Sequence, residues 1–314
     1  MIARLRILTF AGLLAVASCY GIVERALAQP AAPGAEPQIP EPELVDIRTR
    51  DGLQLKATFY PGTLQEKSVP ILMLHDFKSS GAAFQPLALA LQEQGHAVLV
   101  PDLRGHGSST RFVHPITGAV AELQAANMRK ADFLRIVRFD IEALRRFLLE
   151  RNNLGELNLN MLCLIGAEMG AMAALNWAAM DWSAPPLPVG KQGQDVKGLV
   201  LISPQWSYEG IPVKAALDQP GVRSLVSVLL IAGQRGTGAA RDAERIHDIL
   251  ARFRPDRENT PNQDLYLLAR DTSLQGTQML SAPDLNLTTP IVQFIKLRVA
   301  EQEFPWSERP VLRQ

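Results

Sequence analysis

The residues best able to do chemistry in this chain lie in the segment Gly166–Gly170, which reads Gly-Ala-Glu-Met-Gly and follows the apolar run 159–165. Small residues allow a sharp turn between a strand and a helix, and this turn exposes the side chain at its centre. In the G-x-S-x-G pattern that side chain is a nucleophilic serine. Here the central residue is Glu168. The spacing predicts a strained turn that displays a side chain, but the side chain is a carboxylate.

Two interpretations of Glu168 are open. A carboxylate can act as a nucleophile through an ester intermediate, but hydrolysis of that ester needs a histidine to activate water, and no histidine follows His247. Alternatively, the carboxylate is stabilised by the N–H groups and dipole at the start of the following helix. In that case we expect it to bond the loop 76–78, with Lys78 as a charge partner.

Two earlier segments also follow apolar strands. Leu74–Ser80 contains His75, which is expected to anchor the loop, and Pro101–Ser109 reads Pro-Asp-Leu-Arg-Gly-His-Gly-Ser-Ser. In the second segment Asp102, Arg104 and His106 are expected to organise a turn, since Asp and Gly favour turn conformations. The loop 111–130, which carries His114, is the region long enough to form a small lid or binding surface.

The elements that must position these segments alternate along the chain. Short apolar runs indicate strands buried on both faces, and periodic segments indicate helices between them. Asp51-Gly52 predicts a hairpin turn between two strands near the start. The expected strands are 44–50, 53–60, 70–75, 97–101, 157–165, 196–202, 226–232 and 264–269. The expected helices are 83–94, 131–151, 169–180, 239–253 and 290–300. This alternation predicts a parallel sheet with helices on both faces.

Together, the three segments 74–80, 101–109 and 166–170 resemble the α/β-hydrolase superfamily, especially its lipase-like and S33 serine aminopeptidase-like members. The resemblance covers roughly residues 44–300. It implies an α/β-hydrolase fold, in which a mostly parallel eight-stranded sheet has helices on both faces. Residues 204–224 are too few for a large helical cap, so little or no cap domain is expected.

The resemblance also implies roles for single residues. The positions of nucleophile, acid and histidine correspond to Glu168, Gly236 and Gln275, so the catalytic triad is expected to be degenerate. Backbone donors resembling an oxyanion hole are expected at Asp76, Phe77 and Met169. The side chains expected to contribute to binding are His75, Lys78 and His106.

The N-terminus predicts an exported protein. Two arginines precede the apolar stretch 7–17, which is too short for a stable membrane span, as in a signal peptide. Cleavage after Ala28 would leave a Pro-rich linker over 29–43, a domain over 44–302 and a tail over 303–314. Alternatively, a lipobox-like sequence ending at Cys19 would place a lipid there. The localisation expected is therefore periplasmic or secreted, with a lipid anchor as the alternative.

Composition limits the partners. The formal net charge of the 314 residues is zero, which gives no reason to expect nucleic-acid binding. After cleavage only Cys163 remains, so the cysteines offer neither a disulfide nor a zinc site. No cofactor or metal is expected.

The sequence therefore predicts an exported pseudo-hydrolase that binds a small molecule, a peptide or a protein partner at the former substrate site. The alternative is an active hydrolase, esterase-like or peptidase-like, with a carboxylate-based or relocated site. A membrane is expected to matter only through a lipid on Cys19.

Overall fold

A computed structural model describes residues 39–185, 190–235, 238–254 and 260–310. The described residues belong to one compact unit that begins at Ile39. The expected signal peptide, both of its candidate processing sites and residues 29–38 of the expected linker lie outside the described part.

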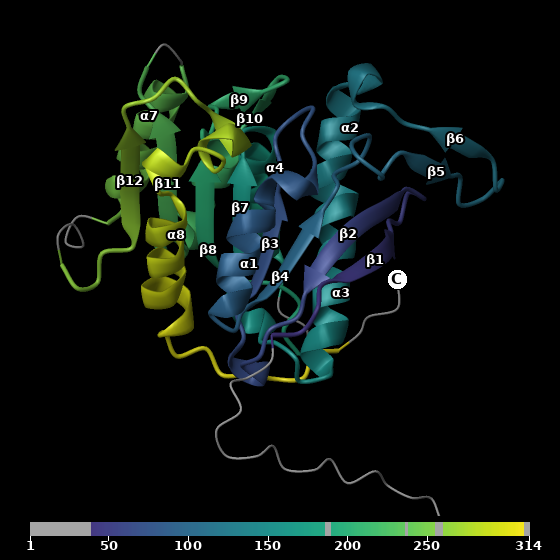
Figure 1. The fold of residues 1–314 in the computed structure, drawn as a ribbon, viewed down its shortest axis with the longest axis horizontal. Helices are drawn as coiled ribbons and strands as arrows, with labels where there is room; N and C mark the ends of the chain where they lie inside the picture. Colours follow the sequence, from purple (N-terminus) through teal and green to yellow (C-terminus); the bar gives the residue numbers. More distant parts are fainter. Residues whose placement is uncertain (1–38, 186–189, 236–237, 255–259, 311–314) are drawn as a thin grey trace, which may run out of the picture. The chain divides into compact units, whose positions relative to one another are not determined.

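One sheet of eight strands forms the centre of the fold, in the order β1-β2-β4-β3-β7-β8-β11-β12 (Figure 1). Strand β2 runs antiparallel to both β1 and β4, and the remaining neighbours pair in parallel. The mostly parallel eight-stranded sheet expected from the sequence is thereby confirmed. The strands are β1 (Glu43–Arg48), β2 (Gln54–Tyr60), β3 (Pro70–Leu74), β4 (Ala97–Pro101), β7 (Leu162–Ala167), β8 (Val196–Ile202), β11 (Ser227–Gly233) and β12 (Leu265–Arg270).

Helices cover both faces of the sheet because successive strand residues point to opposite sides. In β3, Ile71 and Met73 pack with α1 (Gln85–Glu93) and α8 (Thr288–Ile295). Leu72 and Leu74 face the other core, to which three further helices contribute. These are α3 (Ile141–Asn153), α4 (Met169–Ser183) and α7 (Ala239–Ala251). Figure 1 shows α1 and α8 in front of the sheet and α3 and α4 behind it.

The bounds of several elements differ from the sequence prediction, most clearly in two places. The helix expected over 131–151 is divided into α2 (Lys130–Arg135), a π-helical turn (Ile136–Asp140) and α3. The π turn ends at buried Asp140, whose carboxylate accepts hydrogen bonds from Arg104. Strand β7 starts at Leu162 rather than at Leu157, because a 3-10 helix (Leu159–Met161) precedes it.

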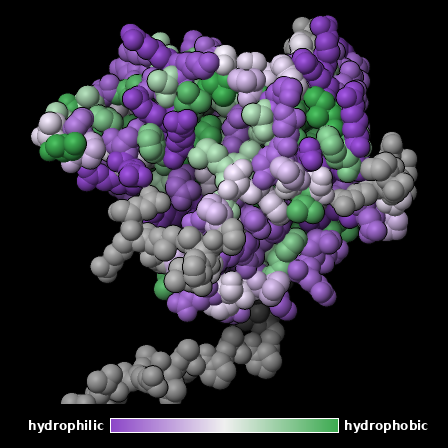
Figure 2. Space-filling view, turned by 180° about the vertical axis from the view of Figure 1, so that it is seen from behind, coloured by the Kyte–Doolittle hydropathy of each residue, from purple (hydrophilic) through white to green (hydrophobic). Residues whose placement is uncertain are grey.

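Two segments, one after β4 and one after β8, form small elements outside the central sheet. Residues 111–122 form a hairpin of β5 (Arg111–Val113) and β6 (Val120–Glu122), which projects from the body in Figure 1. Figure 2 shows apolar atoms at the end of this arm, where Ile116 is 88% exposed. After β8, residues 207–224 hold β9 (Ser207–Tyr208), β10 (Ile211–Pro212) and the short helices α5 (Lys214–Leu217) and α6 (Pro220–Ser224).

The segment after α8 is fixed by hydrogen bonds. A π-helical turn (Lys296–Ala300) continues α8, and the indole N–H of Trp306 donates to the carbonyl of Asn152 at 3.2 Å. Trp306 therefore packs the tail onto the end of α3. No helix in the described part of the chain is long and apolar enough to cross a membrane.

Candidate active site

The turn from β7 into α4 has the strained geometry expected from its glycine spacing. Glu168 stands at this turn with φ 44° and ψ −102°, a region that costs a side-chain-bearing residue on the order of 1–3 kcal/mol. The flanking glycines allow close packing, because a Cβ on Gly170 would lie 1.9 Å from the carbonyl oxygen of Leu74. The turn therefore presses α4 against β3 and displays Glu168 at the carboxyl ends of the strands.

A second carboxylate lies beside Glu168. Asp76, in the loop after β3, accepts hydrogen bonds from the Thr277 N–H at 3.0 Å and from its hydroxyl at 2.8 Å. A Cβ built on Gly276 would lie 2.3 Å from Asp76 Oδ2 and 3.3 Å from Glu168 Cδ. The fold thus brings Asp76 close to Glu168, 92 positions later in the chain, and to Thr277, 201 positions later. Glu168 and Asp76 are called the carboxyl pair below.

The carboxyl pair changes the protonation of Glu168. Partial burial, together with the negative charge of Asp76, raises the pKa of Glu168 above its ordinary value. No ion pair joins Glu168 to Lys78 within the described residues, and the Lys78 ammonium lies 5.7 Å from the centre of the Phe77 ring. The expected Glu168–Lys78 charge pair is therefore wrong, because the Lys78 ammonium lies by the Phe77 ring and the charge that acts on Glu168 is that of Asp76. A role for Lys78 in binding stays a prediction.

Gln275, at the position expected to correspond to the histidine, bonds the end of a neighbouring strand. The amide nitrogen of Gln275 donates to the carbonyl of Gly233, at the end of β11, over 3.2 Å. Gly236, expected at the acid position, lies outside the described residues. His114 accepts hydrogen bonds from the N–H groups of Ile116 and Thr117 in its own hairpin turn, and His247 stands 3.6 Å from Asp248.

The two buried histidines near the site hold loops together. His75 donates from Nδ1 to the Asp76 carbonyl and accepts at Nε2 from the Leu103 N–H, over 2.7 and 2.9 Å. Burial lowers the pKa of His75 to about 4, so the ring is neutral. His106 donates to the carbonyl of Arg104, and its ring lies 5.1 Å from that of His75. The anchoring role expected for His75 is confirmed, whereas ligand contacts by either histidine stay predictions.

The remaining expected positions concern backbone donors. Met169 begins α4, where backbone N–H groups have no partner within the helix. Phe77 directly follows Asp76 on the facing loop. The fold therefore brings Asp76, Phe77 and Met169 to the same edge of the sheet as Glu168, and their service as an oxyanion hole stays a prediction.

Sequence reasoning missed three residues. Thr277 binds Asp76, the Ser203 hydroxyl accepts from the Gly276 N–H at 2.9 Å, and Tyr208 lies close enough for the charges of Glu168 and Asp76 to act on its phenol. Ser203 has a positive φ of 50° at the end of β8, next to the turn. Asp76 itself was a signal in the sequence. A carboxylate in a loop directly after a buried strand needs hydrogen-bond donors, and Thr277 supplies them.

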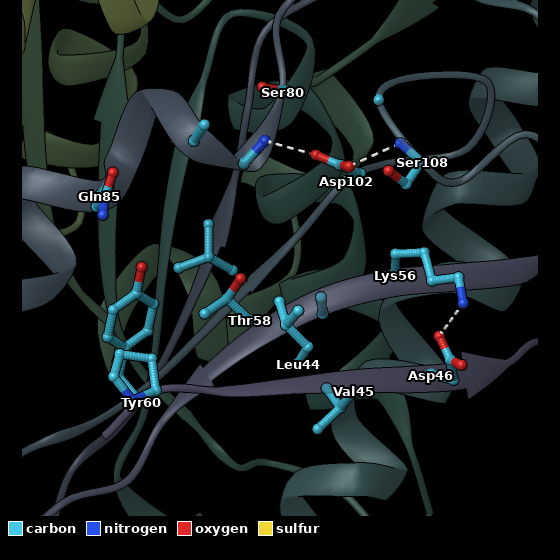
Figure 3. A pocket seen from close by; sticks show the side chains of 16 residues that line it. Leu44, Val45, Asp46, Lys56, Thr58, Tyr60, Ser80, Gln85, Asp102 and Ser108 are labelled. Carbon is cyan, nitrogen blue, oxygen red and sulfur yellow. Dashed lines mark hydrogen bonds and ion pairs between the residues drawn. The ribbon is translucent and has the colours of Figure 1, made fainter. Parts of the chain in front are cut away.

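A cavity of about 740 Å³ lies away from the carboxyl pair, along β1, β2 and the start of α1. Figure 3 shows Asp102 among the residues that line it, and its carboxylate accepts hydrogen bonds from the N–H groups of Gly81 and Ser108. The Lys56–Asp46 ion pair borders another part of the same cavity. Neither Glu168 nor Asp76 lines it. The bonds of Asp102 confirm that it organises the turn after β4.

Among the described residues, no three His, Cys, Asp or Glu side chains are grouped so as to hold a metal ion. The carboxyl pair supplies only two such side chains. The Asp76 carboxylate already accepts hydrogen bonds from the N–H and the hydroxyl of Thr277.

The strained turn and the sheet order are those of a known class. Residues 71–310 match the model of the alpha/beta hydrolase family, and the chain belongs to that family. None of the curated proteins matches the chain.

Solved structures share the fold at low identity. An esterase of Pyrococcus furiosus is 16% identical, with a TM-score of 0.58 over 82% of this chain and 91% of the other. DcsB, solved with a substrate analogue, is 15% identical, with a TM-score of 0.55 over 83% and 100%. The α/β hydrolase GrgF of a Penicillium species is 13% identical, with a TM-score of 0.53 over the same shares. At these identities the likeness establishes the fold alone.

Proposed function

We propose that the protein is an esterase-like hydrolase in which Glu168 serves as the general base. The observation that carries this proposal is a carboxyl group displayed at the strained turn of a hydrolase fold, with its pKa raised. A base is most effective when its pKa lies near the working pH, and burial is the usual way to raise that of a glutamate. The esterase among the similar folds supports the same class of reaction.

The proposed step needs no histidine. The Glu168 carboxylate takes a proton from water while the water oxygen bonds to the acyl carbon of an ester. The carbonyl oxygen gains the negative charge and is stabilised by the N–H groups of Met169 and Phe77. When the C–O bond breaks, the leaving alkoxide takes the proton back from Glu168, which yields an acid and an alcohol. Because Glu168 forms no covalent bond, the route avoids the ester intermediate that would need a histidine for its hydrolysis.

Glu168→Gln provides the test, with p-nitrophenyl acetate and butyrate as substrates of the purified protein. The amide keeps the size of the side chain but cannot accept the proton, so we expect kcat/KM to fall by at least about 100-fold. Glu244→Gln, on the exposed side of α7, is the matched control and should leave the rate unchanged.

Two results would contradict this assignment. Hydrolysis that survives in Glu168→Gln would remove the base from this position. Labelling by a fluorophosphonate probe that disappears when one serine is replaced would transfer the chemistry to that serine.

A second candidate is a ligand-binding protein without turnover. The hydrogen bonds of His75 and His106 support it, since both rings are held within loops and neither bonds Glu168. This candidate predicts no hydrolysis of any ester by the wild-type protein, but saturable binding of a small molecule, a peptide or a partner protein at the same site.

We also propose export, by cleavage after Ala28 or through a lipid on Cys19. Cys163 is buried in β7 without a disulfide, which suits a core too large to need one. The intact mass of the mature protein distinguishes the two routes, because only the second adds a lipid and starts the chain at Cys19. A mass that still includes residues 1–18 would refute export.

A further inference from the structure

Tyr208 lies over the site on a hairpin that the sequence did not predict. Strands β9 and β10 pair with each other, and β9 packs against α4, the helix that Glu168 precedes (Figure 1). The Tyr208 side chain meets Phe133 of α2 edge to face, with the ring centres 5.5 Å apart. Phe133 in turn stands 6.0 Å from Phe77 in the loop after β3. Phe133 therefore lies between Tyr208 and the loop that carries Asp76.

The hydroxyl of Tyr208 has no hydrogen-bond acceptor among the described residues, although the residue is only 9% exposed. The hydroxyl is not among the buried polar atoms that lack a partner, so it is open to solvent and can donate to a bound molecule in place of water. Burial raises the pKa of Tyr208, and the charges of Glu209, Glu168 and Asp76 raise it further. The hydroxyl therefore stays protonated and remains a donor near the carboxyl pair.

We propose that Tyr208 donates a hydrogen bond to the carbonyl oxygen of a substrate held beside Glu168. This inference rests on the proposed function and names the substrate class of the same site. The half-buried Phe77 ring and the edge of Tyr208 offer apolar surface beside the turn, and the carboxyl pair repels anions. The substrate is therefore an uncharged acyl compound with an alkyl or aryl acyl group, and not one with a carboxylate near the scissile bond.

Tyr208→Phe tests the proposal because it keeps the ring and its packing on Phe133. We expect kcat for p-nitrophenyl butyrate to fall about 10-fold while the acid limb of the pH profile, which reports Glu168, stays in place. Tyr266→Phe is the matched control, since its hydroxyl donates to the Gln263 carbonyl at 2.7 Å on the outer strand β12. The control should keep the wild-type kcat.

A binding measurement separates this inference from the proposed function. The hydrate of a phenyl trifluoromethyl ketone resembles the species formed when water adds to an ester, and ¹⁹F NMR reports its binding without turnover. We expect Tyr208→Phe to weaken that binding about 10-fold. If the wild-type protein hydrolyses no ester but Tyr208→Phe still weakens ketone binding, the function fails and the Tyr208 contact stands.

Two outcomes would overturn the Tyr208 contact. One is that Tyr208→Phe binds the ketone and hydrolyses the ester as the wild-type protein does. The other is that the wild-type protein does not bind the ketone at all.

Discussion

At the scale of single residues, the site is defined by the two acids of the carboxyl pair. Asp76 is held by Thr277, so its carboxylate cannot turn away from Glu168. The two acids are therefore linked: partial burial raises the pKa of Glu168, and the charge on Asp76 raises it further.

Asp76→Asn should therefore move the pH dependence of hydrolysis. Glu168 works as a carboxylate, so activity rises as pH increases through its pKa. Removing the neighbouring negative charge lowers that pKa, so the acid limb of the kcat/KM profile should shift to lower pH. Asparagine can still accept from Thr277, which preserves the loop.

Asp46→Asn is the control for this shift, because Asp46 is exposed and pairs with Lys56 on the outer hairpin. An acid limb that stays fixed in Asp76→Asn would mean that the limb belongs to another group.

At the scale of elements, the site depends on how closely α4 approaches β3. A Cβ on Gly166 would lie 2.4 Å from the Gly170 carbonyl oxygen, so both glycines are needed for the turn. Helix α4 sets the position of Glu168 and of the Met169 N–H at once, because both stand at its first turn.

Gly170→Ala should therefore damage both stability and activity. The methyl group would meet the backbone of Leu74, which cannot move aside as a flexible side chain would, and overpacking of this kind costs about 1–3 kcal/mol. We expect that loss in urea unfolding, together with reduced hydrolysis as α4 is displaced. Gly238→Ala is the control, since a Cβ there meets nothing within 4 Å. Equal stability of the two variants would refute the close approach.

At the scale of the whole molecule, the tail ties the last residues of the described chain to the centre of the sheet. Arg309 binds the Asp195 carboxylate at 2.8 Å and the Asn160 side chain at 2.7 Å. Asp195 immediately precedes β8 and also accepts from Arg145 at 2.9 Å. Burial alone would raise the pKa of Asp195, but the charges of Arg145, Arg309 and Lys191 outweigh it and lower the pKa.

Arg309→Met should destabilise the protein by about 3 kcal/mol, the low end of the range for a broken buried pair, because Arg145 remains. Lys296→Met, which removes a surface pair, should cost less than about 1 kcal/mol. Urea unfolding checks both variants.

The effect of Arg309→Met should also depend on pH, which urea unfolding at several pH values checks. Because the folded pKa of Asp195 is lowered, the stability that Asp195 contributes is present above the unfolded pKa of about 3.9 and is lost as pH falls. The effect of Arg309→Met should shrink accordingly in acid, and a pH-independent difference would contradict this account.

Much of the sheet could be predicted because buried parallel strands are short apolar runs. Strands β4 and β8 have the bounds that their apolar residues indicate, and Gly52 adopts the positive φ that its hairpin needs. The π turn before α3 could not be predicted, because it lies where Asp140 meets Arg104, and that contact joins residues 36 positions apart.

The candidate site could be predicted only in part. The spacing of Gly166 and Gly170 indicated the strained turn, since that requirement is local. Tyr208 could not be found, because strands β9 and β10 have two residues each and owe their position to packing on α4. The expected Lys78 partner was wrong for the same reason: the direction of a loop side chain depends on neighbours that are distant in sequence.

The sequence by itself determined the family of folds, the strained turn and the presence of a glutamate at its centre. These follow from local spacing and from the hydrophobic pattern, which need no knowledge of distant contacts. Only the tertiary structure decided that Asp76, Thr277 and Tyr208 surround Glu168. The protonation of a carboxyl group depends on burial and on charges a few ångströms away, and long-range packing alone brings those groups together.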